Sequence, residues 1–422
     1  MSIPFRPASV LLPDFTKYDG TAWSCVACDQ YTSQPEYWEA ADAIAAHTPS
    51  ALRCIIPEVY LAETDVRKPA VLAAMEDYLR DVLVEHPDTM ILVERTLRNG
   101  ETRLGLVGAV DLTTYDYRKG ADSLIRATEA TVAERIPART TVRRDAPVEL
   151  PHVMMLIDDR QKTVVEPLAA LKDTLPLAYD HDLMQDSGHL KGYFLTPALM
   201  EQVDAALAAL ITPEAMAERY GREGLSPLLF AVGDGNHSLA AAKACFEEVR
   251  AEIGDEAAMA HPARYALCEV VNLYDESLQF EPIYRVVFGV DPESLLTAFE
   301  AYIRDLKGTS APQQLLWASN GRVGAMTVSA PVAALTVGTV QDFLDGYMAS
   351  AAPDGAYVDY IHGRGPTIAL ANRPDAVGFL FDGMAKEELF STVISDGALP
   401  RKTFSMGHAE DKRFYTEVRR IK

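Results

Sequence analysis

Apolar and polar residues alternate along this chain in blocks that have the period of a helix in some places and of a strand in others. From residue 68 to residue 84, apolar side chains recur at intervals of three and four, which predicts an amphipathic helix. Two apolar blocks follow, at residues 90–95 and 103–110, and we predict that both are strands. Asn99 and Gly100 between them are a turn signal, so the two blocks predict a β-hairpin.

The middle of the chain continues this alternation. We predict a helix over residues 123–135 and a basic loop over residues 139–144. The apolar run within residues 151–159 predicts a buried strand that ends in the carboxylates of Asp158 and Asp159.

Later blocks extend the pattern to the carboxyl end. The predicted elements are a helix at 197–210, a strand from 229 that leads into a helix, strands at 264–273 and 280–287, a helix at 291–306, strands at 323–328 and 333–337, a helix at 340–348, a strand at 378–382 and a helix at 386–395. Interleaved strands and helices favour an α/β fold, with a mixed α+β fold as the alternative. We place a large α/β core in residues 1–290 and a smaller α+β domain, with a basic carboxyl-terminal segment, in residues 291–422.

Composition narrows the class of protein. Of the 422 residues, 48% are hydrophobic and 24% are charged, which is the balance of an ordinary globular protein. The formal net charge of −22 repels polyanions, so we expect no bulk nucleic-acid binding. We expect no membrane span and no secretory signal, and the five cysteines indicate a reducing cytoplasm.

The segment from Leu229 to Ser238 carries the strongest candidate chemistry. An apolar run ends in Gly233-Asp-Gly-Asn-His-Ser238, and a helix-forming sequence begins at once. Strand, glycine-rich turn and helix present backbone N–H groups to an anion in many α/β proteins. Asp234 and His237 are residue types that act as acids, bases or metal ligands. The alternative is a capped helix start, because Asp, Asn and Ser are all favoured N-cap residues. Four polar residues exceed what one cap needs, so we favour a functional site.

Two further groups could contribute to that site. On the predicted helix, Arg126 and Glu129 lie three residues apart on one face, although such a pair is also a common surface ion pair. The arginines of the basic segment are suited to phosphate or carboxylate, or alternatively to neighbouring acidic side chains; they are Arg135, Arg139, Arg143 and Arg144.

The sequence leaves open whether three other polar groups are functional or structural. His152 and the Asp158–Asp159 pair bracket one apolar strand, and a plain turn explains the carboxylates nearly as well as a site does. Cys25 and Cys28 form a lone C-x-x-C pair without the second pair of ligands that a zinc site needs. A basic run near the carboxyl end, with Arg401 and Lys402, could close over an anion or lie on a surface.

Several of these motifs together resemble a bacterial family known as domain of unknown function 1015. The resemblance runs in family order from Pro4-Phe-Arg6 to Lys402. The residues that carry it are 123–129, 149–152, 157–159, 233–238, 280–283 and 400–402.

Many members of that family have Asp-Gly-His-His-Arg at the turn, which is similar to the phosphate-handling motif of the ParB, sulfiredoxin and free-serine-kinase superfamily. The resemblance implies binding of nucleotide phosphates and phosphoryl transfer on serine or phosphoserine. In this chain, Asn236 replaces the first histidine and Ser238 replaces the arginine. Without that arginine the turn lacks a bidentate phosphate clamp, so Arg126, Arg143 or Arg144 would have to supply the charge.

We therefore expect a cytoplasmic enzyme that transfers or hydrolyses the phosphoryl group of a small anionic metabolite. The expected catalytic residues are Asp234, His237 and Glu129, and the expected phosphate-binding residues are Gly233, Gly235, Asn236, Ser238, Arg126, Arg143 and Arg144. Mg²⁺ on Glu129 or Asp234 is compatible with this reaction, and so is a nucleotide. One alternative is a nucleotide- or metabolite-sensing protein without turnover. Another is a hydrolase of non-phosphate substrates that uses Asp234 and His237.

Overall fold

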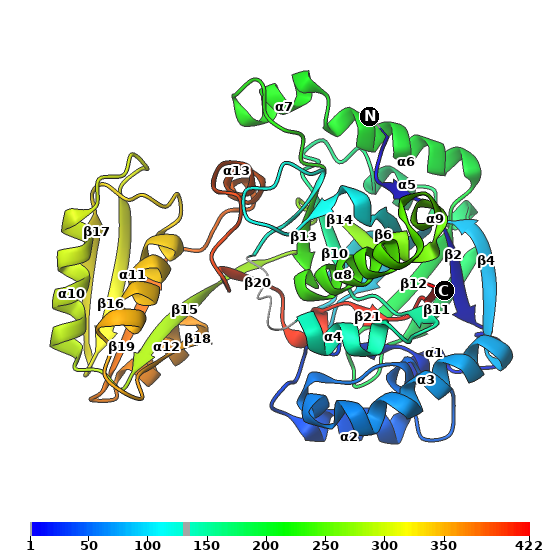
Figure 1. Ribbon diagram of the computed structural model, residues 1–422, viewed down its shortest axis with the longest axis horizontal. Helices are drawn as coiled ribbons and strands as arrows, with labels where there is room; N and C mark the ends of the chain where they lie inside the picture. Colours follow the sequence, from blue (N-terminus) through cyan, green and yellow to red (C-terminus); the bar gives the residue numbers. More distant parts are fainter. Residues whose placement is uncertain (1, 130–135) are drawn as a thin grey trace. The chain divides into compact units, whose positions relative to one another are not determined.

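The computed structural model describes residues 2–129 and 136–422, which form two compact units (Figure 1). The larger unit consists of Met1–Leu278 and His408–Lys422, and the smaller unit is Gln279–Gly407. The boundary expected near residue 290 thus falls inside the smaller unit, and the carboxyl-terminal segment belongs to the larger one. This segment returns because its strand β21 (Phe414–Tyr415) pairs with β3 (Cys25–Val26) and its strand β22 (Arg419–Arg420) pairs with β9 (Val148–Glu149).

A mixed ten-stranded sheet forms the centre of the larger unit. Its order is β11 (Leu177–Asp182), β12 (His189–Phe194), β5 (Ile91–Thr96), β6 (Thr102–Asp111), β14 (Tyr265–Asn272), β10 (Met154–Ile157), β13 (Phe230–Asp234), β8 (Ile125–Ala127) and β7 (Tyr115–Asp116), with β1 (Phe5–Arg6) beside β6. Strand β10 is parallel to β14 and antiparallel to β13, and β13 is parallel to β8. The predicted α/β fold class is confirmed, and so is the hairpin of β5 and β6.

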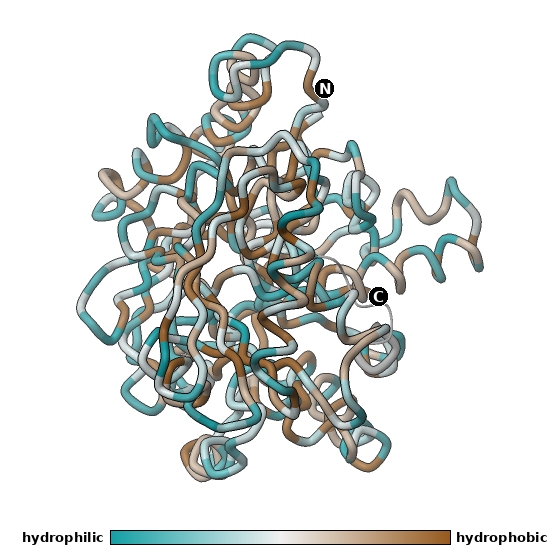
Figure 2. Tube along the Cα trace, turned by 90° about the vertical axis from the view of Figure 1, so that its left-hand side faces the viewer, coloured by the Kyte–Doolittle hydropathy of each residue, from teal (hydrophilic) through white to brown (hydrophobic). Residues whose placement is uncertain are grey.

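Alternating side chains bury both faces of this sheet. In β5, Ile91 and Val93 belong to one apolar core, and Leu92 belongs to another. The first core includes side chains of α2 (Pro35–Ile44) and α3 (Thr64–Asp81), whereas the second includes side chains of α6 (Pro197–Leu210) and α8 (Asn236–Ile253). Helices therefore cover the sheet on both sides. Figure 2 shows hydrophilic residues on many outer loops of the chain.

The larger unit contains further short elements around this core. They are β2 (Ala8–Pro13), α1 (Gly20–Trp23), the 3₁₀ turns Ala51–Cys54 and Glu58–Glu63, β4 (Leu83–Thr89), α4 (Ile136–Arg143), α5 (Glu166–Ala169), α7 (Pro213–Tyr220) and α9 (Asp255–Ala260). Within residues 2–129 and 136–422, no helix combines the length and the apolar character needed to cross a bilayer.

The smaller unit is an antiparallel sheet with helices. Its strand order is β17 (Arg322–Val328), β16 (Gln313–Ser319), β19 (Ala376–Phe381), β15 (Phe280–Phe288) and β18 (Tyr357–His362), with β20 (Phe404–Met406) also paired to β15. Its helices are α10 (Pro292–Asp305), α11 (Thr336–Ser350), α12 (Arg364–Ala371) and α13 (Lys386–Asp396). The strand predicted at residues 333–337 is wrong, because α11 begins within it.

Two predictions beside the candidate site are also wrong. The helix expected over residues 123–135 is instead strand β8 at Ile125–Ala127, and residues 130–135 lie outside the described residues. Hydrogen bonding to β13 and β7 stabilises the extended backbone here and overrides local helix propensity. The basic loop expected at residues 139–144 is largely helix α4, which packs on α8.

Candidate functional site

The turn between β13 and α8 is shaped by a glycine. Gly235 has a φ of 80°, in the left-handed region, and serves as the N-cap of α8. A Cβ atom at this position would lie 3.1 Å from both Cα and Cγ2 of Val153, so the turn packs closely against the chain that leads into β10. Because glycine has no side chain, it leaves the first N–H groups of the 18-residue helix without an N-cap side chain of their own.

Asp234 forms an ion pair with a lysine beside this turn. Its Oδ1 accepts a hydrogen bond of 2.8 Å from the backbone N–H of Gly235, and its Oδ2 lies 3.2 Å from Nζ of Lys412. Lys412 belongs to the carboxyl-terminal segment that returns to the larger unit. A lysine, rather than one of the expected arginines, therefore places positive charge beside the turn.

Asn236 joins the turn to the end of strand β8. Its Oδ1 accepts from the backbone N–H of Thr128 at 3.3 Å, and its Nδ2 donates to Thr128 Oγ1 at 3.3 Å. Thr128 is buried and directly precedes Glu129, so the structure brings the neighbourhood of Glu129 to the turn through a strand rather than a helix. His237 is half-buried on the first turn of α8.

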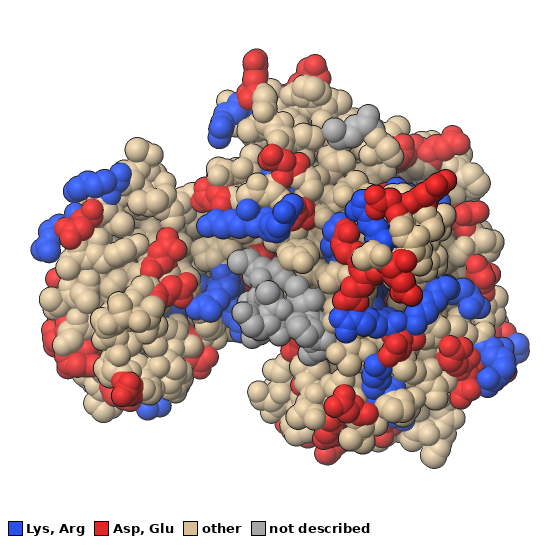
Figure 3. Space-filling model, viewed as in Figure 1, with Lys and Arg blue, Asp and Glu red and all other residues tan. Residues whose placement is uncertain are grey.

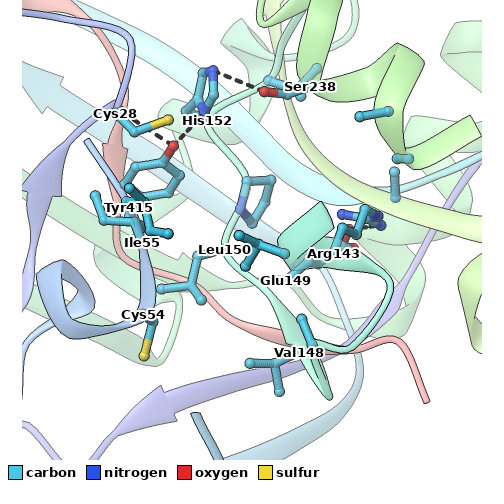
Figure 4. Close-up of a pocket in the computed structure, with 18 of the residues that line it drawn as sticks. Cys28, Cys54, Ile55, Arg143, Val148, Glu149, Leu150, His152, Ser238 and Tyr415 are labelled. Atoms are coloured by element: carbon cyan, nitrogen blue, oxygen red, sulfur yellow. Dashed lines mark hydrogen bonds and ion pairs between the residues drawn. The ribbon is translucent and has the colours of Figure 1, made fainter. Parts of the chain in front are cut away.

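A cavity of about 170 Å³ runs along the first turns of α8 (Figure 4). Ser238, Leu239, Ala241 and Ala242 form the α8 wall of this cavity. The other walls come from the end of α4, from residues 148–153, from the segment around residues 54–61, and from Met75 and Tyr415. All of these residues belong to the larger unit.

Polar side chains, among them the buried His152 and Tyr415, meet at the end of the cavity where α8 begins. Nε2 of His152 lies 3.4 Å from Ser238 Oγ and 3.3 Å from Asp29 Oδ2, and its Nδ1 lies 2.7 Å from Tyr415 OH (Figure 4). The phenol oxygen also accepts from the backbone N–H of Cys28 at 3.3 Å. Burial raises the pKa of Tyr415 well above its ordinary value, so the phenol keeps its proton at neutral pH. Tyr415 can then donate to Nδ1, which leaves Nε2 of His152 to carry the ring proton toward Ser238 and Asp29.

An ion-pair network forms another part of the cavity wall. Arg143 lines the cavity, and its guanidinium contacts Oε2 of Glu149 at 2.5 Å. Oε1 of Glu149 accepts from Arg419 Nε at 2.7 Å and from the Leu267 N–H at 2.8 Å. Burial by itself would raise the pKa of Glu149, but Arg419 and Arg143 keep it below its ordinary value. Arg143 is thus near the predicted site but is already paired with a carboxylate.

The two other arginines expected at the site have different partners. Arg126 is buried in β8 and donates to the backbone carbonyls of Ser123 and Ser226, which precede β8 and β13 rather than follow them. Arg144 makes two hydrogen bonds of 2.6 Å to the carboxylate of Glu248, and both side chains are about half exposed. Neither arginine is among the residues that line the cavity. Figure 3 shows many such basic and acidic side chains interspersed on the viewed face of the larger unit.

The sequence does not predict how three residues reach this region. His152 flanks a strand in the sequence, but its approach to Ser238 depends on strand pairing. Lys412 and Tyr415 lie in a segment without a motif, and the pairing of β21 with β3 brings them to the site. In the smaller unit, Arg401 of the other basic run contacts Asp345 at 2.8 Å.

Across the part of the chain that the structure describes, no three His, Cys, Asp or Glu side chains are grouped in a way that could hold a metal ion. The two oxygens of Asp234 contact Gly235 and Lys412. Among the described residues, the Mg²⁺ expected on Glu129 or Asp234 therefore has no group of three such ligands.

Comparisons with known proteins give distant similarities among solved structures. A conserved hypothetical protein from Pyrococcus furiosus aligns with a TM-score of 0.36 and 10% identity, covering 74% of this chain and 94% of that chain. SbnI from Staphylococcus aureus, truncated at its carboxyl terminus, has a TM-score of 0.35 and 11% identity, covering 73% and 85%. A free serine kinase in complex with AMP has a TM-score of 0.38 and 9% identity, covering 74% and 90%.

No curated protein matches the sequence. The family model described as "Protein of unknown function (DUF1015)" matches residues 12–347, which confirms the resemblance seen in the motifs, and the chain belongs to this family.

Proposed function

We propose that the protein binds a small phosphorylated metabolite with the phosphate at the amino terminus of α8, and that it transfers or hydrolyses the phosphoryl group. The observation that carries this proposal is the position of the glycine-capped start of α8 between Lys412 and the polar end of a cavity. A helix amino terminus presents unpaired N–H groups and a partial positive charge, and both favour a phosphate.

Backbone N–H groups and Lys412 would neutralise the negative charge of the phosphate. Gly235 adopts the left-handed backbone conformation that starts α8, and the N–H groups of Asn236 and Ser238 point along the helix axis toward the turn. Lys412 would contribute the positive charge that the missing arginine supplies in other members of the family. Phosphoryl transfer depends mainly on such positioning and charge stabilisation, so this arrangement suits the reaction.

Proton transfer would fall to Asp234 or His237, with Glu129 at the end of β8 as a further candidate. Asp234 contacts Lys412. A phosphate that attracts Lys412 would leave the carboxylate with less neutralising charge, which favours its action as a base. Phosphoserine, or serine with a nucleotide, is the first substrate to test, as the motif resemblance implies.

Phosphate assays on the purified full-length chain test this function. At least one phosphate monoester in a panel that includes phosphoserine should release phosphate, or pass it to ADP, and the Asp234→Asn and His237→Ala variants should each reduce that rate about 10²- to 10⁴-fold. Asp158→Asn is a matched control, since Asp158 lies at the other end of β10. Equal rates for all four proteins across a panel of phosphorylated metabolites would contradict the enzymatic proposal.

Binding without turnover would point instead to a sensing protein. In that case phosphorylated ligands should raise the melting temperature as mass action requires, and the ligand should be recovered unchanged.

A further inference from the structure

The cavity along α8 is lined mainly by aliphatic side chains. From α8 it receives Leu239, Ala241 and Ala242, and the chain leading into β10 adds Leu150 and Val153. All of these except the half-buried Leu150 are less than 4% exposed. The walls therefore offer a ligand dispersion contacts and few hydrogen bonds.

Five polar side chains of the cavity already interact with one another, and Glu58 and Thr64 also line it. His152, Ser238 and Tyr415 form one group, and Arg143 forms an ion pair with Glu149. A ligand that placed an ammonium or carboxylate group between these groups would lose hydration without gaining matched partners, which is costly. The ammonium and carboxylate groups of a serine ligand are therefore poorly suited to the aliphatic part of the cavity.

The cavity begins where the phosphate is proposed to bind. Ser238 lies in the first turn of α8, and the step from Ser238 to Ala242 covers about 6 Å along the helix axis. An apolar group attached directly to a phosphate at the helix start would enter the cavity without a long linker. The volume of about 170 Å³ is suited to one ring, since aliphatic cavities of roughly 150 Å³ bind benzene.

We infer that the cavity receives the apolar part of the ligand, so that the substrate class is a monophosphate ester of an aromatic or short aliphatic alcohol. This inference rests on the proposed phosphate site and specifies what the phosphate carries. The phosphate would lie at the N–H groups of α8, and the hydrocarbon part would contact Leu239, Ala242 and Val153.

Calorimetric binding to the full-length protein tests the inference without requiring turnover. Benzyl phosphate should bind at least tenfold more tightly than phosphoserine or inorganic phosphate. Ala242→Leu and Ala241→Val fill the cavity and should each weaken benzyl phosphate at least fivefold, with no comparable change for inorganic phosphate. Ala244→Leu is the matched control, because Ala244 lies on the same helix but is not a lining residue.

The outcomes separate the inference from the proposed function. Equal affinities for benzyl phosphate, phosphoserine and inorganic phosphate would overturn the apolar ligand class and leave the phosphate site standing. Binding of benzyl alcohol together with no binding of any phosphate would instead overturn the proposed function. Tighter binding of AMP than of benzyl phosphate, lost in Ala242→Leu, would overturn the simple ester in favour of a nucleobase.

Discussion

Strand β10 has polar side chains at both of its ends, and the two ends differ in how those side chains are used. At the carboxyl end, Asp158 accepts a hydrogen bond of 2.8 Å from Tyr220 OH, and the fully buried Asp159 accepts from the backbone N–H groups of Thr163 and Val164. These carboxylates shape the loop that leaves the strand. At the amino end, His152 contacts its polar partners at the end of the cavity where α8 begins.

Strand direction explains why the amino end has the candidate site. In open α/β sheets, sites usually lie at the carboxyl ends of parallel strands. Here β13 is antiparallel to β10, and Asp234 pairs with Met154 at the start of β10. The carboxyl end of β13, with its glycine turn, therefore meets the amino end of β10. Polar residues beside a strand indicate a site only when the pairing of neighbouring strands is known.

The largest expected effect concerns Arg413, whose contacts stabilise the chain at the amino end of β10. Arg413 is 4% exposed, donates to Pro151 O at 2.6 Å, and pairs with Glu269 and Glu417 at 2.7 Å each. Arg413→Met leaves both carboxylates without their cation, so the free energy of unfolding should fall by about 3–5 kcal/mol. Urea denaturation measures this loss. A loss below about 1 kcal/mol would show that the amino end of β10 does not depend on the ion pairs of Arg413.

Asp159→Ala should destabilise the carboxyl end without affecting a ligand. The substitution removes the acceptor for two backbone N–H groups, so we expect a loss of about 1–3 kcal/mol in the free energy of unfolding. Asp159→Asn retains one acceptor oxygen and should recover part of that loss. Calorimetry should give the same phosphate-ligand affinity as the unsubstituted protein, and a weaker affinity would argue against the contrast between the two ends.

His152→Ala, unlike Asp159→Ala, should weaken ligand binding. Loss of the ring removes the contacts to Ser238 and Tyr415 at the cavity end, and benzyl phosphate should bind about tenfold more weakly, or about 1.4 kcal/mol. Asp158→Asn should leave that affinity unchanged. If both variants bind alike, the amino end has no special relation to the ligand.

Acid should lower the free energy of unfolding through protonation of Glu149, which lies near the amino end of β10. The pKa of this carboxyl is lower in the folded protein than its ordinary value of 4.5, so the folded state binds fewer protons than the unfolded state between the two values. The stabilisation is therefore fully present above pH 4.5 and is lost as the pH falls through the folded pKa, by about 1.4 kcal/mol per unit of pKa difference. Urea denaturation of the protein and of Glu149→Gln should converge below pH 4.5, and a constant difference would contradict the assignment.

Arg144→Ala should have the smallest effect. Its partner Glu248 is about half exposed, and exposed ion pairs contribute about 0.2–1 kcal/mol. Thermal denaturation and benzyl phosphate binding should both remain close to those of the unsubstituted protein. A large loss of binding would restore Arg144 to the phosphate site predicted from the sequence.

Local patterns succeeded where an element forms from its own residues. The periodicity of residues 68–84 predicted α3, although the last residues of that block begin β4. The Asn99-Gly100 signal predicted the hairpin of β5 and β6. Residues 125–127 were predicted as a helix because their extended form depends on hydrogen bonds to β13 and β7, which lie elsewhere in the sequence.

The sequence by itself determined the α/β class, the family, and the strand, glycine turn and helix around Gly235, because these depend on neighbouring residues and on the backbone freedom of glycine. Tertiary structure alone decided which side chains meet that turn. The antiparallel register of β10 and β13 brought His152, and the pairing of β21 with β3 brought Tyr415 and Lys412. Such contacts join distant parts of the chain through backbone hydrogen bonds and burial, and no local pattern of residues encodes them.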